Sequence, residues 1–327
     1  MRAGIIGLGN MGSAIGNLIA NNGYEVIGWE YNKKVVEEIN KFHKNEKFLK
    51  GITLHPNLRA TDKIEEVVSR SDVLFVSIPS AFIKSTLDDK SDIINKDTII
   101  VNLAKGIDKE SELTVFQMLS EIFPDNEKVM LSGPSIANEY SRKMPTVVIL
   151  AGKNRISLLK VSKLLDNDYF RTRFSDDIIG VELGGILKNI YAIGLGLFDG
   201  KGIKSINFRS VYLTIALEEM SRIGIGLGAK LKTFLYLSGM GDLLTTSLSE
   251  HSHNRRMGEL LASGLDIEEI KNKMGVLPEG YNTLKIILDI AEKYHISIPL
   301  AKGLWQVING KFEVEKFIYS FIKEFIE

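Results

Sequence analysis

The sequence contains no cysteine among its 327 residues. Disulfides, thiolate zinc sites, iron–sulfur ligation and a cysteine nucleophile are therefore excluded, and the chemistry must use other side chains. A secretion signal is not expected either, because the chain begins almost at once with a strand-like run, Arg2–Ile6, in place of a basic region and an apolar segment. We therefore do not expect a secreted protein.

Net charge and long apolar runs are also absent. Lysine plus arginine and aspartate plus glutamate each number 41, so no overall field draws the chain toward nucleic acid and any bound anion must be small and local. The longest apolar stretch, around Ile190–Phe198, is interrupted by glycines and falls short of the roughly 20 residues that a membrane helix needs. We expect no membrane span.

The first half of the chain alternates short β-branched runs with helix-period segments, which is typical of strand–helix–strand units feeding a mainly parallel sheet. Several of the runs are apolar throughout, as buried parallel strands are. The predicted strands are Arg2–Ile6, Glu25–Trp29, Val73–Ile78, Thr98–Asn102, Val129–Ser132, Thr146–Leu150 and Tyr169–Phe174.

The pattern changes near residue 177. From there, long amphipathic or apolar segments follow one another, separated by glycines and without recurrent strands. We therefore predict two domains, an α/β dinucleotide-binding domain over residues 1–177 and an all-helical substrate and catalytic domain over residues 178–327.

A Gly-x-Gly-x-x-Gly pattern follows the first predicted strand and opens a helix-period segment. In such a turn Gly7 permits the tight bend, Gly9 lets a pyrophosphate approach the backbone, and Gly12 allows close helix packing. The amides at the start of the helix then face the anion. The pattern predicts a Rossmann-type site, with a plain tight turn as the alternative.

Glu30 lies at the end of the second predicted strand and bears on the choice of coenzyme. An acidic side chain there hydrogen-bonds the ribose hydroxyls and repels a 2′-phosphate, which favours NAD over NADP. Lys33 and Lys34 follow it and offer contacts to a 2′-phosphate, so NADP stays open.

Lys188 lies in the segment 181–193, which is apolar on all sides and predicts a buried helix. Burial disfavours an ammonium, which brings the pKa of a lysine toward the range of acid–base catalysis. Hydride transfer to or from a secondary alcohol needs such a group. The structural alternatives are an ion pair with Glu182 or another acid, or a side chain that reaches solvent.

Further polar groups suit a phosphorylated polyol. Lys105 and the segment 132–137 each follow a predicted strand, where ligands of open α/β sheets gather. The segments 239–246 and 252–256 supply an acid, hydroxyls, an amide and cations. His251 and His253 have no obvious third ligand, so we expect no metal.

Taken in order, these motifs resemble the bacterial-type NAD(P)-dependent glycerol-3-phosphate dehydrogenase family, from the first strand to nearly the C-terminus. The segments that carry the resemblance are 7–12 (GLGNMG), 78–80 (IPS), 104–106 (AKG), 132–137 (SGPSIA), 181–194 (VELGGILKNIYAIG), 199–200 (DG), 239–243 (GMGDL), 254–258 (NRRMG) and 278–280 (PEG).

The resemblance implies a Rossmann-type domain and a helical domain like the C-terminal domain of 6-phosphogluconate dehydrogenase, in a cytoplasmic homodimer. It implies the reversible reduction of dihydroxyacetone phosphate to sn-glycerol 3-phosphate, which feeds glycerophospholipid synthesis.

By the same resemblance Lys188 is the proton acceptor, and Lys105 and Asp242 are the other catalytic residues. The implied substrate contacts are Lys105, Gly133, Ser135, Lys188, Asn189, Asp242, Ser252, His253, Asn254 and Arg255. The implied dinucleotide contacts are Gly7, Gly9, Asn10, Met11, Gly12, Glu30, Tyr31, Lys105, Ala137 and Glu279.

His253 departs from the family, which has an arginine before the asparagine. A permanently charged bidentate phosphate partner is therefore missing. One hypothesis is that Arg255 or Arg256 turns inward and restores the charge; another is that His253 binds phosphate when it is protonated.

Two other functions are open alternatives. A β-hydroxyacid dehydrogenase shares the Gly-Leu-Gly-x-Met-Gly start and a lysine on a helix of the second domain, but its lysine and asparagine lie a full turn apart, whereas Lys188 and Asn189 are adjacent. A dinucleotide-binding regulator without catalysis is the other, because a fold does not fix a function. Lys188, Lys105 and Asp242 argue against the regulator.

Overall fold

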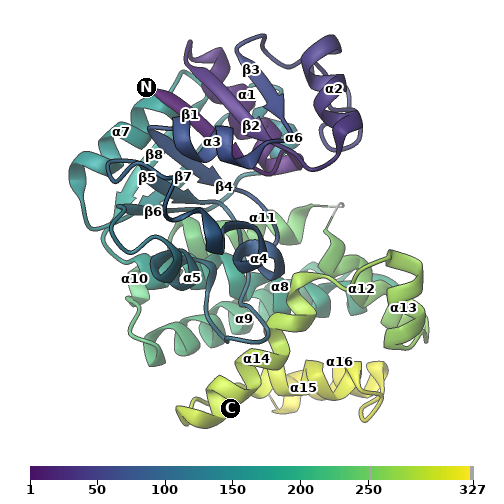
Figure 1. The fold of residues 1–327 in the computed structure, drawn as a ribbon. Coiled ribbons are helices and arrows are strands. Elements are labelled where there is room, and N and C mark those ends of the chain that lie inside the picture. The colour runs from purple at the N-terminus through teal and green to yellow at the C-terminus, as the bar shows by residue number, and fades with distance from the viewer. Residues whose placement is uncertain (250–251, 325–327) are drawn as a thin grey trace. The chain divides into compact units, whose positions relative to one another are not determined.

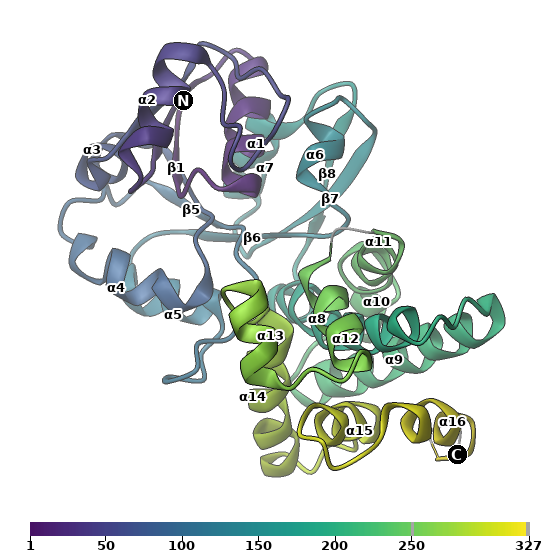
Figure 2. The same ribbon diagram turned by 90° about the vertical axis from the view of Figure 1, so that its right-hand side faces the viewer.

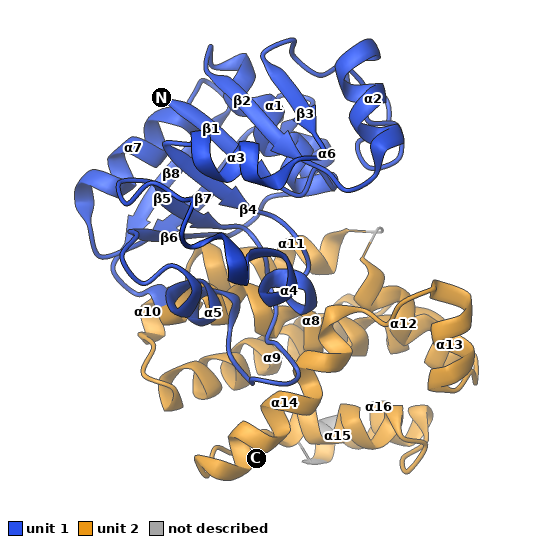
Figure 3. Cartoon of the chain, in the orientation of Figure 1, with its two compact units in different colours: residues 1–178 blue, residues 179–327 orange. Residues whose placement is uncertain are grey.

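The computed structural model describes residues 1–249 and 252–324 (Figure 1). The chain divides into two compact units, Met1–Ile178 and Ile179–Glu327 (Figure 3). Strands and helices alternate in the first unit, whereas every regular element in the described part of the second unit is helical. The predicted fold class is confirmed.

The first unit, all of which is described, contains one eight-stranded sheet in the order β3-β2-β1-β4-β5-β6-β7-β8. Neighbouring strands are parallel except for the antiparallel pair β6 and β7. The strands are β1 (Arg2–Ile6), β2 (Glu25–Trp29), β3 (Leu58–Thr61), β4 (Val73–Val76), β5 (Ile99–Asn102), β6 (Lys128–Ser132), β7 (Thr146–Ala151) and β8 (Phe170–Ser175).

Strand β3 was not predicted. Its four residues, Leu-Arg-Ala-Thr, contain no apolar β-branched run, and only Leu58 and Ala60 are buried, as is possible for a strand at the edge of the sheet. These residues form a strand because they pair with β2, and this long-range pairing cannot be seen in the local sequence.

Helices cover both faces of the sheet, because successive strand residues point to opposite sides. Ile5 and Phe75 join one buried cluster with residues of α1, α2, α6 and α7, while Ile6 and Val76 join another with residues of α3, α4 and α5. The helical segments are α1 (Asn10–Asn21), α2 (Lys33–Phe42), α3 (Ile64–Arg70), η1 (Ser80–Phe82), α4 (Ile83–Leu87), η2 (Asp88–Lys90), α5 (Val115–Ile122), α6 (Ala137–Tyr140) and α7 (Arg155–Leu165).

The second unit is built around α8, with α12 lying beside α8 and α13 (Figure 2). Polar side chains of Ser205, Ser252 and Asp266 cap α9, α12 and α13, which fixes where these helices begin. The elements are α8 (Ile178–Gly200), α9 (Ile206–Gly226), α10 (Leu231–Phe234), the π-helical η3 (Leu237–Gly241), α11 (Asp242–Leu248), α12 (His253–Ala262), α13 (Ile267–Met274), α14 (Glu279–Lys293), α15 (Pro299–Ile308) and α16 (Val314–Glu324).

Helix α8 is longer than the apolar stretch seen in the sequence. It has 23 residues, and by length and composition it is apolar enough to cross a membrane. The expectation that every apolar segment is too short for a membrane helix was therefore wrong for α8. However, 78% of its apolar window is buried inside the protein, as in the core helix of a folded domain.

A buried carboxylate connects three helices of the second unit. Glu219 on α9 is 1% exposed and accepts a hydrogen bond of 2.9 Å from the hydroxyl of Tyr191 on α8. It also accepts the amides of Leu300 and Ala301, at 2.9 and 2.8 Å, in the first turn of α15. Burial raises the pKa of Glu219, although these donors oppose the rise.

This raised pKa predicts a pH-dependent stability. The folded state holds a proton on Glu219 more tightly than the unfolded chain does, so the stabilising contribution is full below about pH 4.5 and is lost as pH rises through the raised pKa. Urea unfolding at several pH values should show the stability advantage of wild type over Glu219→Gln shrinking as pH rises. An advantage that is constant or grows with pH would refute this assignment.

Candidate active site

The glycine-rich turn connects β1 to α1 at the carboxyl edge of the sheet. Gly7 has φ of +92°, which a glycine adopts without strain. A Cβ on Gly12 would lie 1.9 Å from the carbonyl oxygen of Gly7, so the start of α1 can approach the turn only with glycine there. A Cβ on Gly9 would meet nothing within 4 Å. The fold requires Gly12, whereas Gly9 leaves open space above its backbone.

A loop after α2 supports this turn. Asn45 is fully buried and donates to the carbonyl oxygen of Leu8 at 2.8 Å and to the hydroxyl of Ser13 at 2.9 Å. The side-chain amide of Asn10 donates to the carbonyl oxygen of Phe48 at 2.5 Å. The role of Asn45 was not predicted, because nothing in the local sequence connects it to a turn 37 residues earlier.

Glu30 and Tyr31 follow β2 at the same edge. Glu30 is 3% exposed, and one carboxylate oxygen accepts the backbone amide of Asn32 at 3.0 Å. Tyr31 is 71% exposed. A fixed carboxylate thus stands at the strand end, followed by an exposed aromatic ring.

The other predicted residues of the first unit also follow parallel strands. Lys105 lies three residues beyond β5, and Gly133 lies directly after β6 with φ of +113°. The hydroxyl of Ser135 donates to the carbonyl oxygen of Gly133 at 3.0 Å, and Ala137 opens α6. Because β1, β4, β5 and β6 run parallel side by side, these groups lie beyond the same edge as the glycine-rich turn.

Met11 contacts α6 from the start of α1. Its sulfur accepts a hydrogen bond of 3.2 Å from the hydroxyl of Tyr140. Burial raises the pKa of this hydroxyl far above its ordinary value, so it acts as a donor at any physiological pH. The contact fixes the beginning of α1 against α6.

In the second unit Lys188 forms a buried polar cluster. Its Nζ donates to Oδ1 of Asp242 at 2.5 Å and to Oγ1 of Thr246 at 2.7 Å. The side chains of Lys188 and Asp242 are 12% and 2% exposed. Asp242 and Thr246 are four residues apart on α11, so they lie on one face of that helix.

Two further helices, α12 and α14, meet α8 at the residue next to Lys188. The side-chain amide of Asn254 on α12 donates to Oδ1 of Asn189 on α8 at 3.1 Å, and the backbone amide of Gly280 on α14 donates to Oδ1 of Asn254 at 2.9 Å. Glu279 is the first residue of α14. Two predicted substrate contacts, Asn189 and Asn254, are therefore hydrogen-bonded to each other.

The start of α12 carries the remaining predicted residues. Ser252 caps the helix, and His253, its first residue, is exposed. Arg255 donates to both Asp199 and backbone carbonyls, and Arg256 forms an ion pair with Glu259 at 2.6 Å on the helix surface. His251 lies outside the described residues.

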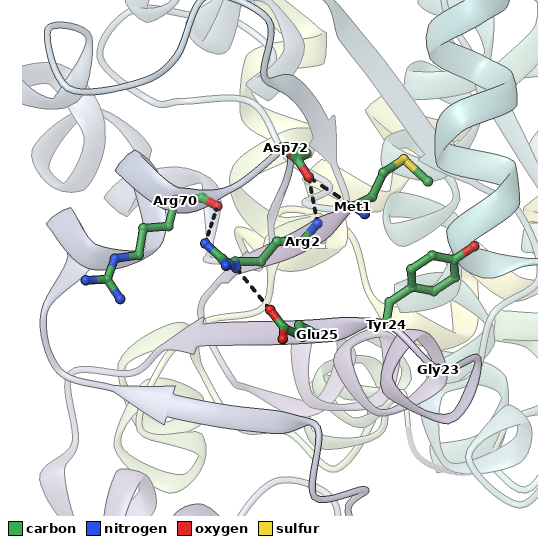
Figure 4. A pocket seen from close by; sticks show the side chains of 7 residues that line it. All are labelled: Met1, Arg2, Gly23, Tyr24, Glu25, Arg70 and Asp72. Atoms are coloured by element: carbon green, nitrogen blue, oxygen red, sulfur yellow. Dashed lines mark hydrogen bonds and ion pairs between the residues drawn. The ribbon is translucent and has the colours of Figure 1, made fainter.

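One open depression of about 410 Å³ lies at the amino ends of β1 and β2, lined by Met1, Arg2, Gly23, Tyr24, Glu25, Arg70 and Asp72 (Figure 4). Arg2 binds both acidic residues of the lining: its side chain forms an ion pair with Glu25 at 3.4 Å, and its backbone amide donates to Asp72 at 2.7 Å. No predicted site residue lines it, so it is not a candidate active site.

A doubly wound sheet with an open glycine-rich turn, followed by a helical unit with a buried lysine, defines a nicotinamide-dinucleotide-dependent oxidoreductase. Family models agree: residues 2–157 match the NAD-dependent glycerol-3-phosphate dehydrogenase N-terminus, and residues 177–319 match its C-terminus. The chain belongs to the NAD-dependent glycerol-3-phosphate dehydrogenase family, as its motifs predicted.

Similar proteins cover nearly the whole chain. Glycerol-3-phosphate dehydrogenase (NAD(P)+) from Clostridium perfringens is 35% identical over 94% of this chain and 92% of its own length. The protein of the same name from Bacillus velezensis is 34% identical over 98% of this chain and 93% of its own length. The crystal structure of glycerol-3-phosphate dehydrogenase from Coxiella burnetii is 28% identical, with a TM-score of 0.91 over 99% of each chain.

The two glycines of the turn predict opposite effects of substitution. Gly9→Ala should leave the free energy of unfolding unchanged or raise it by up to about 1 kcal/mol, because φ is −68° and the added methyl meets no atom. The same methyl occupies the space needed by a pyrophosphate, so the dissociation constant for NADH should rise about tenfold or more.

Gly12→Ala is the matched comparison and should unfold the first unit, because its methyl collides with backbone. Fluorescence titration with NADH and urea unfolding measure both quantities. Unimpaired NADH binding by Gly9→Ala would contradict the proposed pyrophosphate position.

Proposed function

We propose that this protein catalyses the reversible reduction of dihydroxyacetone phosphate to sn-glycerol 3-phosphate with NAD(P). The observation that carries the proposal is the buried amine of Lys188, hydrogen-bonded to Asp242 and Thr246, in a chain of the glycerol-3-phosphate dehydrogenase family. A secondary alcohol and its ketone differ by a hydride and a proton, and this cluster is suited to move the proton.

The first unit is suited to hold the dinucleotide. Backbone amides at the start of α1 have no side-chain cap, and the space above Gly9 lets a pyrophosphate approach them. The bound nicotinamide supplies or accepts the hydride. We assign to dinucleotide binding Gly7, Gly9, Asn10, Met11, Gly12, Glu30, Tyr31, Lys105, Ala137 and Glu279.

Lys188 is the general acid and base of the proposed reaction. In the direction of reduction its ammonium donates a proton to the ketone oxygen, and in the direction of oxidation its amine accepts the hydroxyl proton. An ammonium has three N–H donors, and the bonds to Asp242 and Thr246 direct two of them. Their role is to fix where Nζ points, which is the geometric requirement of general acid–base catalysis.

The substrate is a small phosphorylated molecule. We assign its binding to Lys105, Gly133, Ser135, Asn189, Ser252, His253 and Asn254 together with Lys188 and Asp242. The cations, hydroxyls and amides of this set match a phosphate and two oxygen-bearing carbons. Arg255 contributes to this site through its contacts with other residues.

We further propose that NAD is preferred to NADP. The carboxylate of Glu30 is held at the end of β2 by the amide of Asn32, where it would meet a 2′-phosphate with like charge. Membership of the family supports a homodimer that acts in the cytoplasm and supplies sn-glycerol 3-phosphate to glycerophospholipid synthesis.

Lys188→Met tests the proton role. The methionine fills the same space without an N–H, so kcat for dihydroxyacetone phosphate reduction should fall at least about 100-fold, within the range that general acids contribute. NADH binding should be unchanged, because the assigned dinucleotide contacts remain. Absorbance of NADH at 340 nm reports turnover, with a 3-hydroxy acid and NAD as the control substrates; turnover of the 3-hydroxy acid alone would overturn the proposed substrate.

His253 predicts a pH-dependent Michaelis constant. An imidazole is not permanently charged as a guanidinium is, and its neutral form binds phosphate weakly. KM for dihydroxyacetone phosphate should therefore rise with pH more steeply in wild type than in His253→Arg. Titration of the substrate itself affects both proteins equally, so it cancels when the wild-type KM is divided by the KM of the variant. A ratio of the two KM values that does not change with pH would dismiss this role.

A further inference from the structure

Asp199 joins two arginines near the end of α8. One of its oxygens forms an ion pair with Arg209 of α9. The other accepts two hydrogen bonds from Arg255 of α12, from Nε at 2.9 Å and from Nη2 at 2.6 Å. The side chains of Asp199 and Arg255 are 17% and 14% exposed, so the pair is largely shielded from solvent. Such two-bond pairs fix direction as well as distance.

The remaining terminal nitrogen of Arg255 binds the end of α11. Nη1 donates to the carbonyl oxygens of Ser247 and Ser249, at 2.9 and 2.6 Å. The last carbonyls of a helix lack partners within the helix, and a cation there is favourable. One guanidinium therefore ties the carboxyl ends of α8 and α11 to the beginning of α12.

Each of these three helices carries residues of the proposed active site. Lys188 lies on α8, Asp242 and Thr246 on α11, and Asn254 on α12. Thr246 directly precedes Ser247, whose carbonyl oxygen Arg255 binds. A shift of that carbonyl therefore moves the hydroxyl that accepts from Lys188.

The guanidinium acts at a distance from the reacting amine. Asp199 is 11 residues beyond Lys188 on the same helix, about 16 Å along its axis at 1.5 Å per residue. Helices α8 and α12 also touch by backbone, since a Cβ on Gly196 would lie 1.9 Å from the carbonyl oxygen of Arg255. The backbone at Arg255 is thus held against α8, and its side chain connects this position to the end of α11.

We propose that Asp199 and Arg255 are a positioning pair for the reaction: they hold α11 so that Asp242 and Thr246 direct the amine of Lys188. The inference rests on the proposed function and deepens it. It also replaces the expectation that Arg255 touches the substrate phosphate, because the guanidinium is already bound to Asp199 and to two carbonyls.

Arg255→Lys is the informative variant, because it keeps the charge and loses the planar fork that reaches both Asp199 and the carbonyls. Arg222→Lys is the matched control. Arg222 also binds a carboxylate, Glu218 at 2.7 Å, and a carbonyl oxygen, that of Ser297 at 2.9 Å, but it holds no helix of the proposed site. Both variants are assayed well below their thermal transitions, with NADH.

For Arg255→Lys we expect kcat to fall about 10- to 100-fold, the scale of loss from a small misplacement of a catalytic group. The dissociation constant for NADH should stay unchanged. The kcat/KM values for dihydroxyacetone phosphate and for dihydroxyacetone, which lacks the phosphate, should fall by the same factor. Arg222→Lys should keep wild-type kcat.

Three results would overturn the pair's role. A lowered thermal transition with wild-type kcat would make Arg255 purely structural. A loss confined to the phosphorylated substrate would make it a phosphate contact. An equal loss of kcat in Arg222→Lys would make the effect nonspecific. Absence of dihydroxyacetone phosphate turnover in wild type would instead refute the proposed function, so the two failures are distinguishable.

Discussion

The ion pair between Lys188 and Asp242 is the interaction on which the proposed chemistry depends. Both side chains are nearly removed from solvent, and a buried charge without a partner is strongly destabilising. The pair is neutral as a whole, and Thr246 accepts a further ammonium hydrogen. An apolar helix of 23 residues thereby carries a largely buried ammonium near its middle. Such an arrangement costs stability compared with a hydrophobic core, which is why a buried lysine indicates function.

The two units contribute different kinds of contact to the proposed site. In the first, the proposed anion contacts are mainly backbone amides at strand ends and at the start of α1, so binding needs little side-chain charge and the chain as a whole is neutral. In the second, a few buried charges are held by networks such as Lys188 with Asp242 and Asp199 with Arg255. In the proposed function, backbone geometry therefore binds the dinucleotide, and networks of side chains direct the proton transfer.

The sequence predicted most of the fold because the signals of the fold are local. The glycine-rich turn follows a strand directly, buried parallel strands such as Val73–Val76 are apolar throughout, and the change from strands to helices is visible near residue 177. Edge strand β3 escaped because it is short and half exposed. Lys188 could be proposed from the sequence because a charge stands out within an apolar helix.

The partners of the site residues were harder to predict, because they come from distant segments. Thr246 lies 58 residues from Lys188, and Arg255 lies 56 residues from Asp199. Periodicity shows which face of a helix is buried, but it does not show which other helix packs there. The contacts of Arg255 with Asp199 and with the end of α11 were consequently not predicted.

The kinetics of the Lys188→Met/Asp242→Asn double variant test the central claim most directly. If Asp242 acts by directing Lys188, its replacement adds nothing once the amine is gone. We predict that kcat/KM for dihydroxyacetone phosphate in the double variant equals that of Lys188→Met within about threefold. A double variant that loses the product of the two single losses would contradict it, because Asp242 would then act independently of the amine.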